Sequence, residues 1–265
     1  MKSFIDDFKK CFEKVTETSD DVIVIQSQII PIASYYKISG KKILQEIYNF
    51  IIDLSKYKTV MLPAFSDDII KFKKFDLILS KCNTGSLPNY CIEKKEFKRN
   101  LSPLHSFIAY GPRANEIINL KQDTTWGKGS VFEWIEKNNS RWIALNLEWR
   151  SGCALHHRAE ELTRVPYRFF KKYHGSLYLN KNYVSEITET KYSYSLDVIP
   201  KFDYSIWPNF FKKNDTLFYK VNDGIKMRSA LAKIIVQRSI EFYLNDPYLS
   251  IINKENVQRW VESKK

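Results

Sequence analysis

Residues 22–27, VIVIQS, begin the stretch that decides the fold class, and KKILQEIYNFIIDL (41–54) and KTVMLPAF (58–65) complete it. VIVIQS is a short β-branched run and predicts a buried strand. In 41–54 the apolar residues recur at helical spacing, and KTVMLPAF predicts a second strand that Pro63 closes. A strand, a helix and a strand in this order form a crossover unit, so the two strands should be parallel.

Elements of the same kinds are predicted on both sides of this unit. Helices are expected at 3–16, after Gly111-Pro112, at 130–138, at 154–162 and at 229–244. Strands are expected at 106–111 and 141–149, while residues 66–103 are polar and predict a long surface excursion. Because no repeat or linker interrupts the pattern, we expect one α/β domain over residues 1–265, with a strand-rich insertion at about 175–222.

Composition limits the class of protein. The chain has 265 residues, of which 44% are hydrophobic and 15% aromatic, so it can bury a core and is not a disordered chain. Its four cysteines form no CxxC pair, and no Cys/His cluster has zinc spacing, so we expect reduced thiols, a cytoplasmic location and no metal site. The N-terminal segment lacks the apolar core of a signal peptide, and no apolar run has membrane-spanning length.

The chain carries a net charge of +12, from 42 Lys and Arg against 30 Asp and Glu. A lysine-rich solvated surface explains such a balance, and so does an anionic ligand: nucleic acid, a phosphorylated cofactor or a nucleotide-linked substrate. A basic nucleic-acid-binding protein without catalysis is therefore one alternative function. The lysines are spread along the chain rather than gathered in a stripe, and no nucleic-acid-binding motif occurs, which argues against nucleic acid as a partner.

His157 and Glu160 are the candidate catalytic pair. They stand three residues apart in the helix expected at 154–162, so they share one face and can touch. A carboxylate on one ring nitrogen fixes the tautomer and raises the basicity of the other, as a general base requires. An ordinary surface His–Glu pair has the same spacing, and such pairs outnumber catalytic ones. Cys153 is interpreted as a buried structural thiol, since a catalytic Cys and His rarely come from one helical turn.

The loop Gly127-Lys128-Gly129-Ser130 leads into the helix expected at 130–138. Glycines let the backbone approach a ligand closely, and a helix N-terminus favours a phosphate or a polarised carbonyl. An ordinary loop has the same composition, so both interpretations stay open. Neither a GxSxG elbow nor a GxxxxGK[ST] motif occurs, which leaves serine hydrolases and P-loop enzymes unsupported.

Seven short motifs follow one another along the chain. They are Asp21 with VIVIQS, TVMLPAFS (59–66), TGSLP (84–88), RNLSPLHS (99–106), FIAYGPRA (107–114), GKGSVFEWI (127–135) and ALHHRAEELTRVP (154–166). In this order they resemble the motifs of the antibiotic N-acetyltransferase family, whose founding members acetylate the 3-amino group of aminoglycosides. The last motif carries His157, Glu160 and Pro166 at the family spacing, and the resemblance covers roughly residues 1–250.

The resemblance implies a three-layer α/β/α fold with a central mixed sheet. It also implies acetyl-CoA as the donor and direct transfer to an amine in a ternary complex, with His157 as general base and Glu160 as its acidic partner. The residues expected to line the donor site are Ser27, Ser106, Gly129 and Ser130, and backbone N–H groups at the helix start would hold the thioester oxygen. The candidates for binding the CoA phosphates are Arg99, Arg113 and Lys128.

Charge and departures from the family motifs bear on the acceptor. The departures are Gln26 and Ser102 in place of histidines, Ala154 in place of a threonine, and Asn146 or Leu147 in place of a glycine. A basic protein repels a polycationic aminoglycoside and attracts an anionic acceptor, so we expect a nucleotide-linked amino sugar used for surface polysaccharide. An aminoglycoside 3-N-acetyltransferase that confers antibiotic resistance is the alternative with the same chemistry. The oligomeric state stays open, with a homodimer as one alternative.

Overall fold

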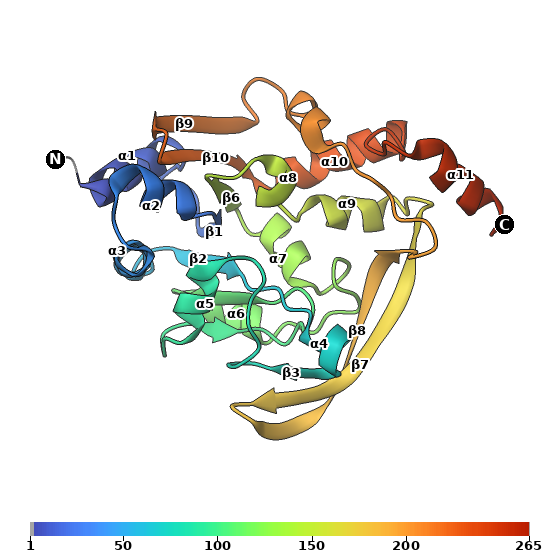
Figure 1. Ribbon diagram of the computed structural model, residues 1–265, viewed down its shortest axis with the longest axis horizontal. Coiled ribbons are helices and arrows are strands. Elements are labelled where there is room, and N and C mark those ends of the chain that lie inside the picture. Colours follow the sequence, from blue (N-terminus) through green and yellow to red (C-terminus); the bar gives the residue numbers. More distant parts are fainter. Residues whose placement is uncertain (1–2, 265) are drawn as a thin grey trace.

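A seven-stranded mixed sheet forms the middle layer of the computed structural model, which describes residues 3–264 (Figure 1). Its strands are β1 (Val22–Ser27), β2 (Thr59–Pro63), β4 (Lys98–Arg99), β5 (Phe107–Tyr110), β6 (Ser140–Leu145), β9 (Thr216–Asn222) and β10 (Ile225–Leu231). They lie in the order β4-β5-β2-β1-β6-β10-β9. β1 is parallel to β2 and β6, and the outer strands pair antiparallel, which confirms the expected mixed sheet.

The unit formed by β1, α3 (Gly40–Leu54) and β2 has the predicted crossover form. Ser39 begins the helix, and its side chain accepts a hydrogen bond from the backbone N–H of Lys42. Ile43, Ile47 and Ile51 recur every fourth residue and are fully buried. Both strands are buried along nearly their whole length, as expected of parallel strands with helices on both faces.

Alternate side chains of the strands enter two separate cores. Val22 and Val24 of β1 lie in one core, and Ile23 and Ile25 lie in the other. The first core is covered by α7 (Val131–Lys137), α9 (His156–Leu162) and α10 (Ala232–Asn245). The second is covered by α1 (Phe4–Lys14), α2 (Ile30–Tyr36), α3 and α5 (Ser86–Ile92). The helices therefore sandwich the sheet, and the three-layer α/β/α prediction is confirmed.

Some element boundaries differ from those predicted. The strand expected at 141–149 ends at Leu145, because Asn146 adopts a left-handed conformation with φ of 55°. Asparagine tolerates this region better than most residues, which explains why the strand can turn at this position. The helix expected at 229–244 begins only at Ala232, since the three preceding residues pair with β6 in β10.

The remaining helices are short or peripheral. They are α4 (Asp68–Phe72), α6 (Ala114–Ile118), α8 (Trp149–Gly152), the 3-10 helix η1 (Tyr204–Phe210) and α11 (Lys254–Glu262). Over residues 3–264, none of the helices has both the length and the apolar composition needed to cross a membrane. The expected surface excursion at 66–103 was partly wrong, because Leu87 and Cys91 of α5 are fully buried in the second core.

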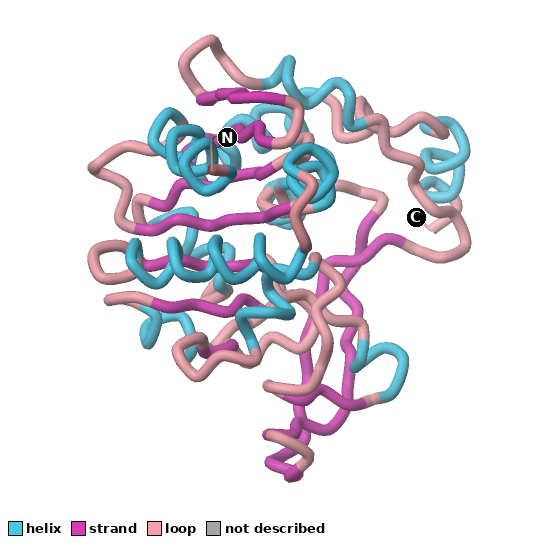
Figure 2. The backbone as a smooth tube through the Cα atoms, turned by 60° about the vertical axis from the view of Figure 1, so that its left-hand side comes forward, coloured by secondary structure: helices cyan, strands magenta, loops and turns pink. Residues whose placement is uncertain are grey.

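A second sheet of three strands extends away from the main sheet (Figures 1 and 2). It contains β3 (Lys74–Asp76), β7 (Arg168–Leu179) and β8 (Asn182–Tyr194) in the order β3-β7-β8. The strand-rich segment expected at about 175–222 thus comprises most of this hairpin and the edge strand β9 of the main sheet. The base of the hairpin brings side chains of β7 and β8 next to α9.

Candidate active site

α9 places His157 and Glu160 at the carboxyl edge of the parallel strands. The helix follows β6 and the short α8, and ligands of α/β folds collect at this edge of the sheet. His157 Nδ1 lies 2.6 Å from Glu160 Oε2. The contact expected from the three-residue spacing is therefore present in the structure.

Glu160 is buried and has three partners. Its Oε2 also lies 2.9 Å from Arg168 Nη2, and its Oε1 accepts a hydrogen bond of 2.9 Å from the Tyr167 hydroxyl. Burial opposes ionisation of Glu160, but the positive charges of Arg168 and His157 outweigh it and hold the pKa of the carboxyl well below its usual range. Glu160 is therefore a carboxylate whose position is fixed from three sides.

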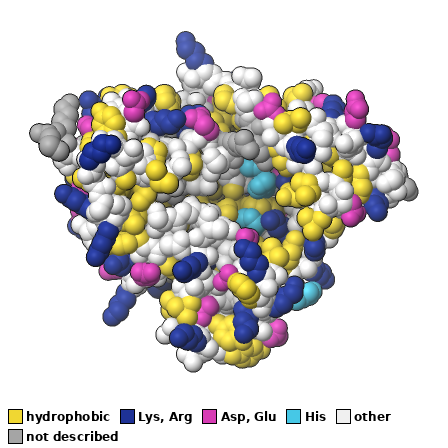
Figure 3. All heavy atoms as spheres, viewed as in Figure 1, with side chains coloured by type: hydrophobic (Ala, Val, Ile, Leu, Met, Phe, Trp, Pro, Cys, Tyr) yellow, Lys and Arg dark blue, Asp and Glu magenta, His cyan; other side chains and the backbone are white. Residues whose placement is uncertain are grey.

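His157 is arranged to accept a proton at Nε2. Because Glu160 is ionised, Nδ1 carries the hydrogen of their shared bond, which leaves the lone pair on Nε2. Burial lowers the pKa of His157, and Glu160 offsets this only in part, so the ring is neutral near pH 7. The side chain is 25% exposed. Figure 3 views the molecule from the same side as Figure 1. It shows histidine side chains near the middle of the surface, with Lys or Arg side chains beside them.

The neighbouring His156 has different surroundings. Its Nδ1 lies 2.9 Å from the carbonyl oxygen of Cys153, and its ring packs 5.0 Å from that of Trp207. Only 5% of the residue is exposed, and burial holds its pKa well below the ordinary value. Consecutive residues of a helix point about 100° apart, so only one of the two histidines shares the face of Glu160.

An aromatic side chain, Trp126, packs against His157. The two ring centroids are 5.0 Å apart, and the ring centroid of His105 lies 4.3 Å from that of Trp126. Lys191 of β8 places its ammonium 6.0 Å from the centroid of the same indole. Trp126 Nε1 and His105 Nδ1 are buried without a hydrogen-bond partner among residues 3–264. Such atoms are costly to bury, so they mark a surface that a polar ligand can complete.

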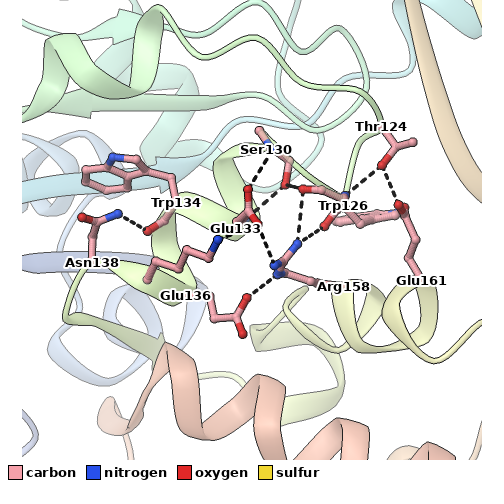
Figure 4. Close-up of polar contacts among 12 residues, drawn as sticks. Thr124, Trp126, Ser130, Glu133, Trp134, Glu136, Asn138, Arg158 and Glu161 are labelled. Atoms are coloured by element: carbon pink, nitrogen blue, oxygen red, sulfur yellow. Dashed lines mark hydrogen bonds and ion pairs between the residues drawn. The ribbon is translucent and has the colours of Figure 1, made fainter.

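Another face of α9 fastens the loop that carries Trp126 (Figure 4). Arg158 donates to the carbonyl oxygen of Trp126 at 2.7 Å and pairs with Glu136 of α7. Glu161 accepts a hydrogen bond of 2.6 Å from Thr124 Oγ1. One helix therefore positions both the histidine and the indole that packs against it.

A comparison with known protein families assigns the chain to one of them. A sequence profile described as aminoglycoside 3-N-acetyltransferase matches residues 53–223, which is more than half of the chain. The chain belongs to this family. It is therefore an N-acetyltransferase, an acyl-transferring enzyme. No curated protein sequence matches it significantly.

Solved structures of aminoglycoside acetyltransferases share the fold. AAC(3)-Xa superposes with a TM-score of 0.73 at 16% identity, over 90% of this chain and 92% of that chain. AAC(3)-IIb gives 0.73 at 15% identity, over 91% and 97%. The YokD protein from Bacillus subtilis gives 0.71 at 15% identity, over 91% and 99%. At these identities the likeness establishes the fold alone.

Three of the residues predicted to bind the donor, Lys128, Gly129 and Ser130, lie in the loop before α7. Lys128 is exposed, whereas Ser130 is buried and accepts a hydrogen bond from the backbone N–H of Glu133 at 3.1 Å. Gly129 N donates to Glu133 Oε2 at 2.8 Å, so this N–H is already used and is not left for a thioester oxygen. Gly129 has a φ of 74°, and a Cβ there would collide with the carbonyl oxygen of Lys121, which is reason enough for a glycine.

Ser27, Arg99 and Ser106 also lie at the carboxyl edge. Ser27 ends β1, and Ser106 directly precedes β5, whose first residue pairs with the last residue of β2. The Arg99 guanidinium is buried and donates to Ser106 Oγ at 2.8 Å and to the carbonyl oxygens of Ser80 and Ala64 at 2.6 and 2.5 Å. These three bonds fasten neighbouring loops to one another. They use the Arg99 guanidinium, which we expected to bind a CoA phosphate.

Arg113 lies at the opposite edge of the sheet. β5 is antiparallel to β2, so the residues after β5 return to the amino end of β2, where the Arg113 backbone N–H donates to Thr59 Oγ1 at 2.9 Å. Its guanidinium pairs with Glu116 at 2.7 Å. The structure therefore does not bring Arg113 together with His157.

His156, His157 and Glu160 also place three potential metal ligands within 4.8 Å of one another. The Arg168 guanidinium lies 2.9 Å from Glu160 Oε2 and would repel a cation bound to that carboxylate. Histidine Nδ1 atoms that a metal could use are already bonded, to Cys153 O and to Glu160.

Four side chains around His157 were missed by sequence reasoning: Trp126, Tyr167, Arg168 and Lys191. Tyr167 and Arg168 follow Pro166 at the end of the last motif, so their short distance from Glu160 along the chain was an available signal. Trp126 and Lys191 come from a loop and a strand of the hairpin, and no sequence spacing connects either of them to α9.

Proposed function

We propose that the whole chain acts as one acetyltransferase domain that transfers the acetyl group of acetyl-CoA directly to a primary amine of an amino sugar, with His157 as general base. The observation that carries the proposal is the 2.6 Å contact between His157 Nδ1 and Glu160 Oε2. Arg168 and Tyr167 fix that carboxylate from behind, so the partly exposed imidazole is held with Nε2 free to take a proton.

The chemistry needs one proton transfer at the amine. The thioester supplies an activated acetyl group when acetyl-CoA is bound. As the amine nitrogen bonds to the acetyl carbon and the carbon–sulfur bond breaks to release CoA as a thiolate, His157 Nε2 takes the proton that the nitrogen loses. Glu160 stabilises the imidazolium that forms, and a positioned base of this kind contributes about 10²–10⁴-fold to the rate.

Unpaired polar atoms at this edge of the sheet suit the donor. Trp126 Nε1 is a hydrogen-bond donor, and His105 Nδ1 and Gln26 Oε1 are further buried atoms without partners among residues 3–264. The pantetheine arm of CoA carries two amide groups and ends in a thioester, so it offers both carbonyl oxygens and N–H groups to such atoms. Ser27 and Ser106 lie at the same edge of the sheet and remain proposed donor-site residues.

Two classes of amino sugar are candidates for the acceptor. Aminoglycosides come first, because the matching family is named for them and related enzymes are known in complexes: AAC-VIa with sisomicin and a variant of AAC(3)-IVa with a gentamicin. A nucleotide-linked amino sugar is the second candidate. The net charge of +12 favours it, since a basic protein attracts an anionic acceptor and repels a polycation.

A thiol-release assay tests the proposal. Purified protein is incubated with acetyl-CoA and, in parallel, with sisomicin, gentamicin and nucleotide-linked amino sugars. We expect acceptor-dependent release of CoA from the wild type, and loss of that release in His157→Ala with CoA binding retained. Failure of the wild-type protein to bind CoA at millimolar concentration in calorimetry would exclude the acetyltransferase mechanism.

A further inference from the structure

Lys191 presents a cation beside the proposed base. Its ammonium lies 6.0 Å from the centroid of the Trp126 indole, and the same indole packs against His157, with ring centroids 5.0 Å apart. Both groups therefore lie against the same indole. Burial and the charge of Arg168 lower the pKa of Lys191 to about 8, so the side chain is mostly charged near pH 7.

Lys191 forms no ion pair with the carboxylates that the structure describes, because those nearest to it have other partners. Glu160 is bound by Arg168 and His157. Asp67 lies 3.5 Å from Lys71.

Glu189, two residues before Lys191 in β8, is also fully engaged. It accepts hydrogen bonds from Ser102 Oγ at 2.8 Å, from Thr125 Oγ1 at 2.6 Å, and from Leu104 N and Gln122 Nε2. Both oxygens of this buried carboxylate therefore accept hydrogen bonds from the surrounding loops. A desolvated ammonium that forms no direct ion pair is costly, and an anionic ligand would reduce that cost.

The pairing of the hairpin adds a second cation. Lys171 of β7 lies directly opposite Lys191 of β8, so the two side chains leave the same face of the hairpin. Like charges in this position destabilise a strand pair. The arrangement gains from an anion that lies between or beside the two ammonium groups.

We infer that Lys191 binds an anionic group of the acceptor, a carboxylate or a phosphate carried close to the amine that His157 deprotonates. This inference rests on the proposed function and selects the second of its two acceptor classes, an anionic amino sugar. A polycationic aminoglycoside would meet Lys191 as a like charge, whereas an acidic or phosphorylated amino sugar would meet a counter-charge. The phosphates of CoA are the other source of negative charge, but the length of the pantetheine arm separates them from the thioester and hence from His157.

The test compares two acceptors that differ by one phosphate, glucosamine and glucosamine 6-phosphate, in calorimetric titrations of the CoA-bound protein. The variants are Lys191→Met, Lys191→Arg and the control Lys172→Met, which removes an exposed lysine of the same hairpin. We expect the wild type to bind the phosphorylated sugar about ten- to a hundredfold more tightly, the usual contribution of a hydrogen bond to a charged group. Lys191→Met should abolish this ratio, while Lys191→Arg and Lys172→Met should keep it.

Equal binding of the two sugars by the wild type, or an unchanged ratio in Lys191→Met, would overturn the inference. To separate the two sources of negative charge, thiol release is measured with acetyl-CoA and with acetyl-pantetheine, which lacks the nucleotide phosphates. If Lys191→Met raises the KM for acetyl-CoA alone, Lys191 serves the donor and the inference is wrong. Loss of CoA binding by the wild type would instead refute the proposed function, so the two failures are distinguishable.

Discussion

Glu160→Gln removes one negative charge from the centre of the site and changes its shape very little. In the wild type, Glu160 Oε2 accepts from His157 at 2.6 Å and lies 2.9 Å from Arg168, while Oε1 accepts from Tyr167 at 2.9 Å. An amide can keep its oxygen toward His157 and Arg168 and turn its NH2 toward the Tyr167 oxygen. The substitution therefore leaves the contacts and takes away the counter-charge.

The substitution should lower both the unfolding free energy and kcat, because Arg168 and His157 each lose their negatively charged partner. The Arg168 guanidinium stays buried without a carboxylate, and breaking a buried ion pair in this way typically costs about 3–5 kcal/mol of unfolding free energy. The imidazolium of His157 loses a hydrogen bond to a charged group, which contributes about 1.5–3 kcal/mol. At 1.4 kcal/mol per tenfold, kcat should fall by about 10–100-fold, less than in a variant without the histidine.

Denaturant unfolding and thiol release on the same preparation measure both effects. Tyr167→Phe is the matched control, because it removes one hydrogen bond from Glu160 Oε1 and leaves the charge in place. Its unfolding free energy should fall by about 1.5–3 kcal/mol, the contribution of a hydrogen bond to a charged group and less than the loss in Glu160→Gln, with kcat close to that of the wild type. If Glu160→Gln unfolds like the wild type and keeps its kcat within a factor of about two, the assigned role of the carboxylate is wrong.

Unfolding at acid pH tests whether the Glu160 carboxylate stabilises or destabilises the fold. The pKa of Glu160 is lowered in the folded protein, so its contribution to stability is present above the unfolded pKa of about 4.3 and is lost as the pH falls toward the folded value. The difference in unfolding free energy between wild type and Glu160→Gln should therefore stay constant near neutral pH and shrink below about pH 4.3. A difference that grows in acid would contradict a stabilising carboxylate.

Three further predictions concern α9. His157→Ala should lower kcat by about 10²–10⁴-fold while calorimetry still detects CoA binding, whereas His156→Ala should lose stability but keep its rate; the reverse pattern would exchange their roles. The wild-type kcat should be flat near neutral pH and fall only as the pH drops below the pKa of His157, which lies under 6.5. Arg158→Met should loosen the Trp126 loop and raise KM values more than it lowers kcat, which steady-state kinetics would show.

The sequence was most informative where structure depends on regular spacing. The crossover unit was predictable because apolar residues of α3 repeat every three or four positions and β1 is a continuous apolar run. The end of β6 was not predictable from the sequence. The strand stops because a single residue, Asn146, adopts a positive φ in a stretch that otherwise continues the apolar pattern. Similarly, α5 lies in a polar segment, and its short buried face is made by Leu87, Pro88 and Cys91, too few apolar residues to form a helical pattern.

Contacts set by local spacing were also the predictable part of the site, whereas contacts set by tertiary packing were missed. His157 and Glu160 were predicted as a contact because three residues of helix bring side chains together whatever the rest of the fold does. Arg168 reaches Glu160 only because β7 starts beside α9, and Lys191 approaches only because β8 pairs with β7. Contacts of this kind depend on tertiary packing, which a single sequence does not encode in any local pattern.

α9 explains why the motif around His157 is dense with charged residues. Successive residues of a helix point about 100° apart, so the pair His157 and Glu160 and the pair Arg158 and Glu161 lie on different faces although they are adjacent in sequence. The first pair forms the proposed base, and the second holds the loop of Trp126 through its carbonyl oxygen and Thr124. A shift of the helix by one residue would break both sets of contacts at once. The position of the base is thus tied to the position of the indole beside it. A substitution on either face of α9 should therefore displace the side chains on the other face.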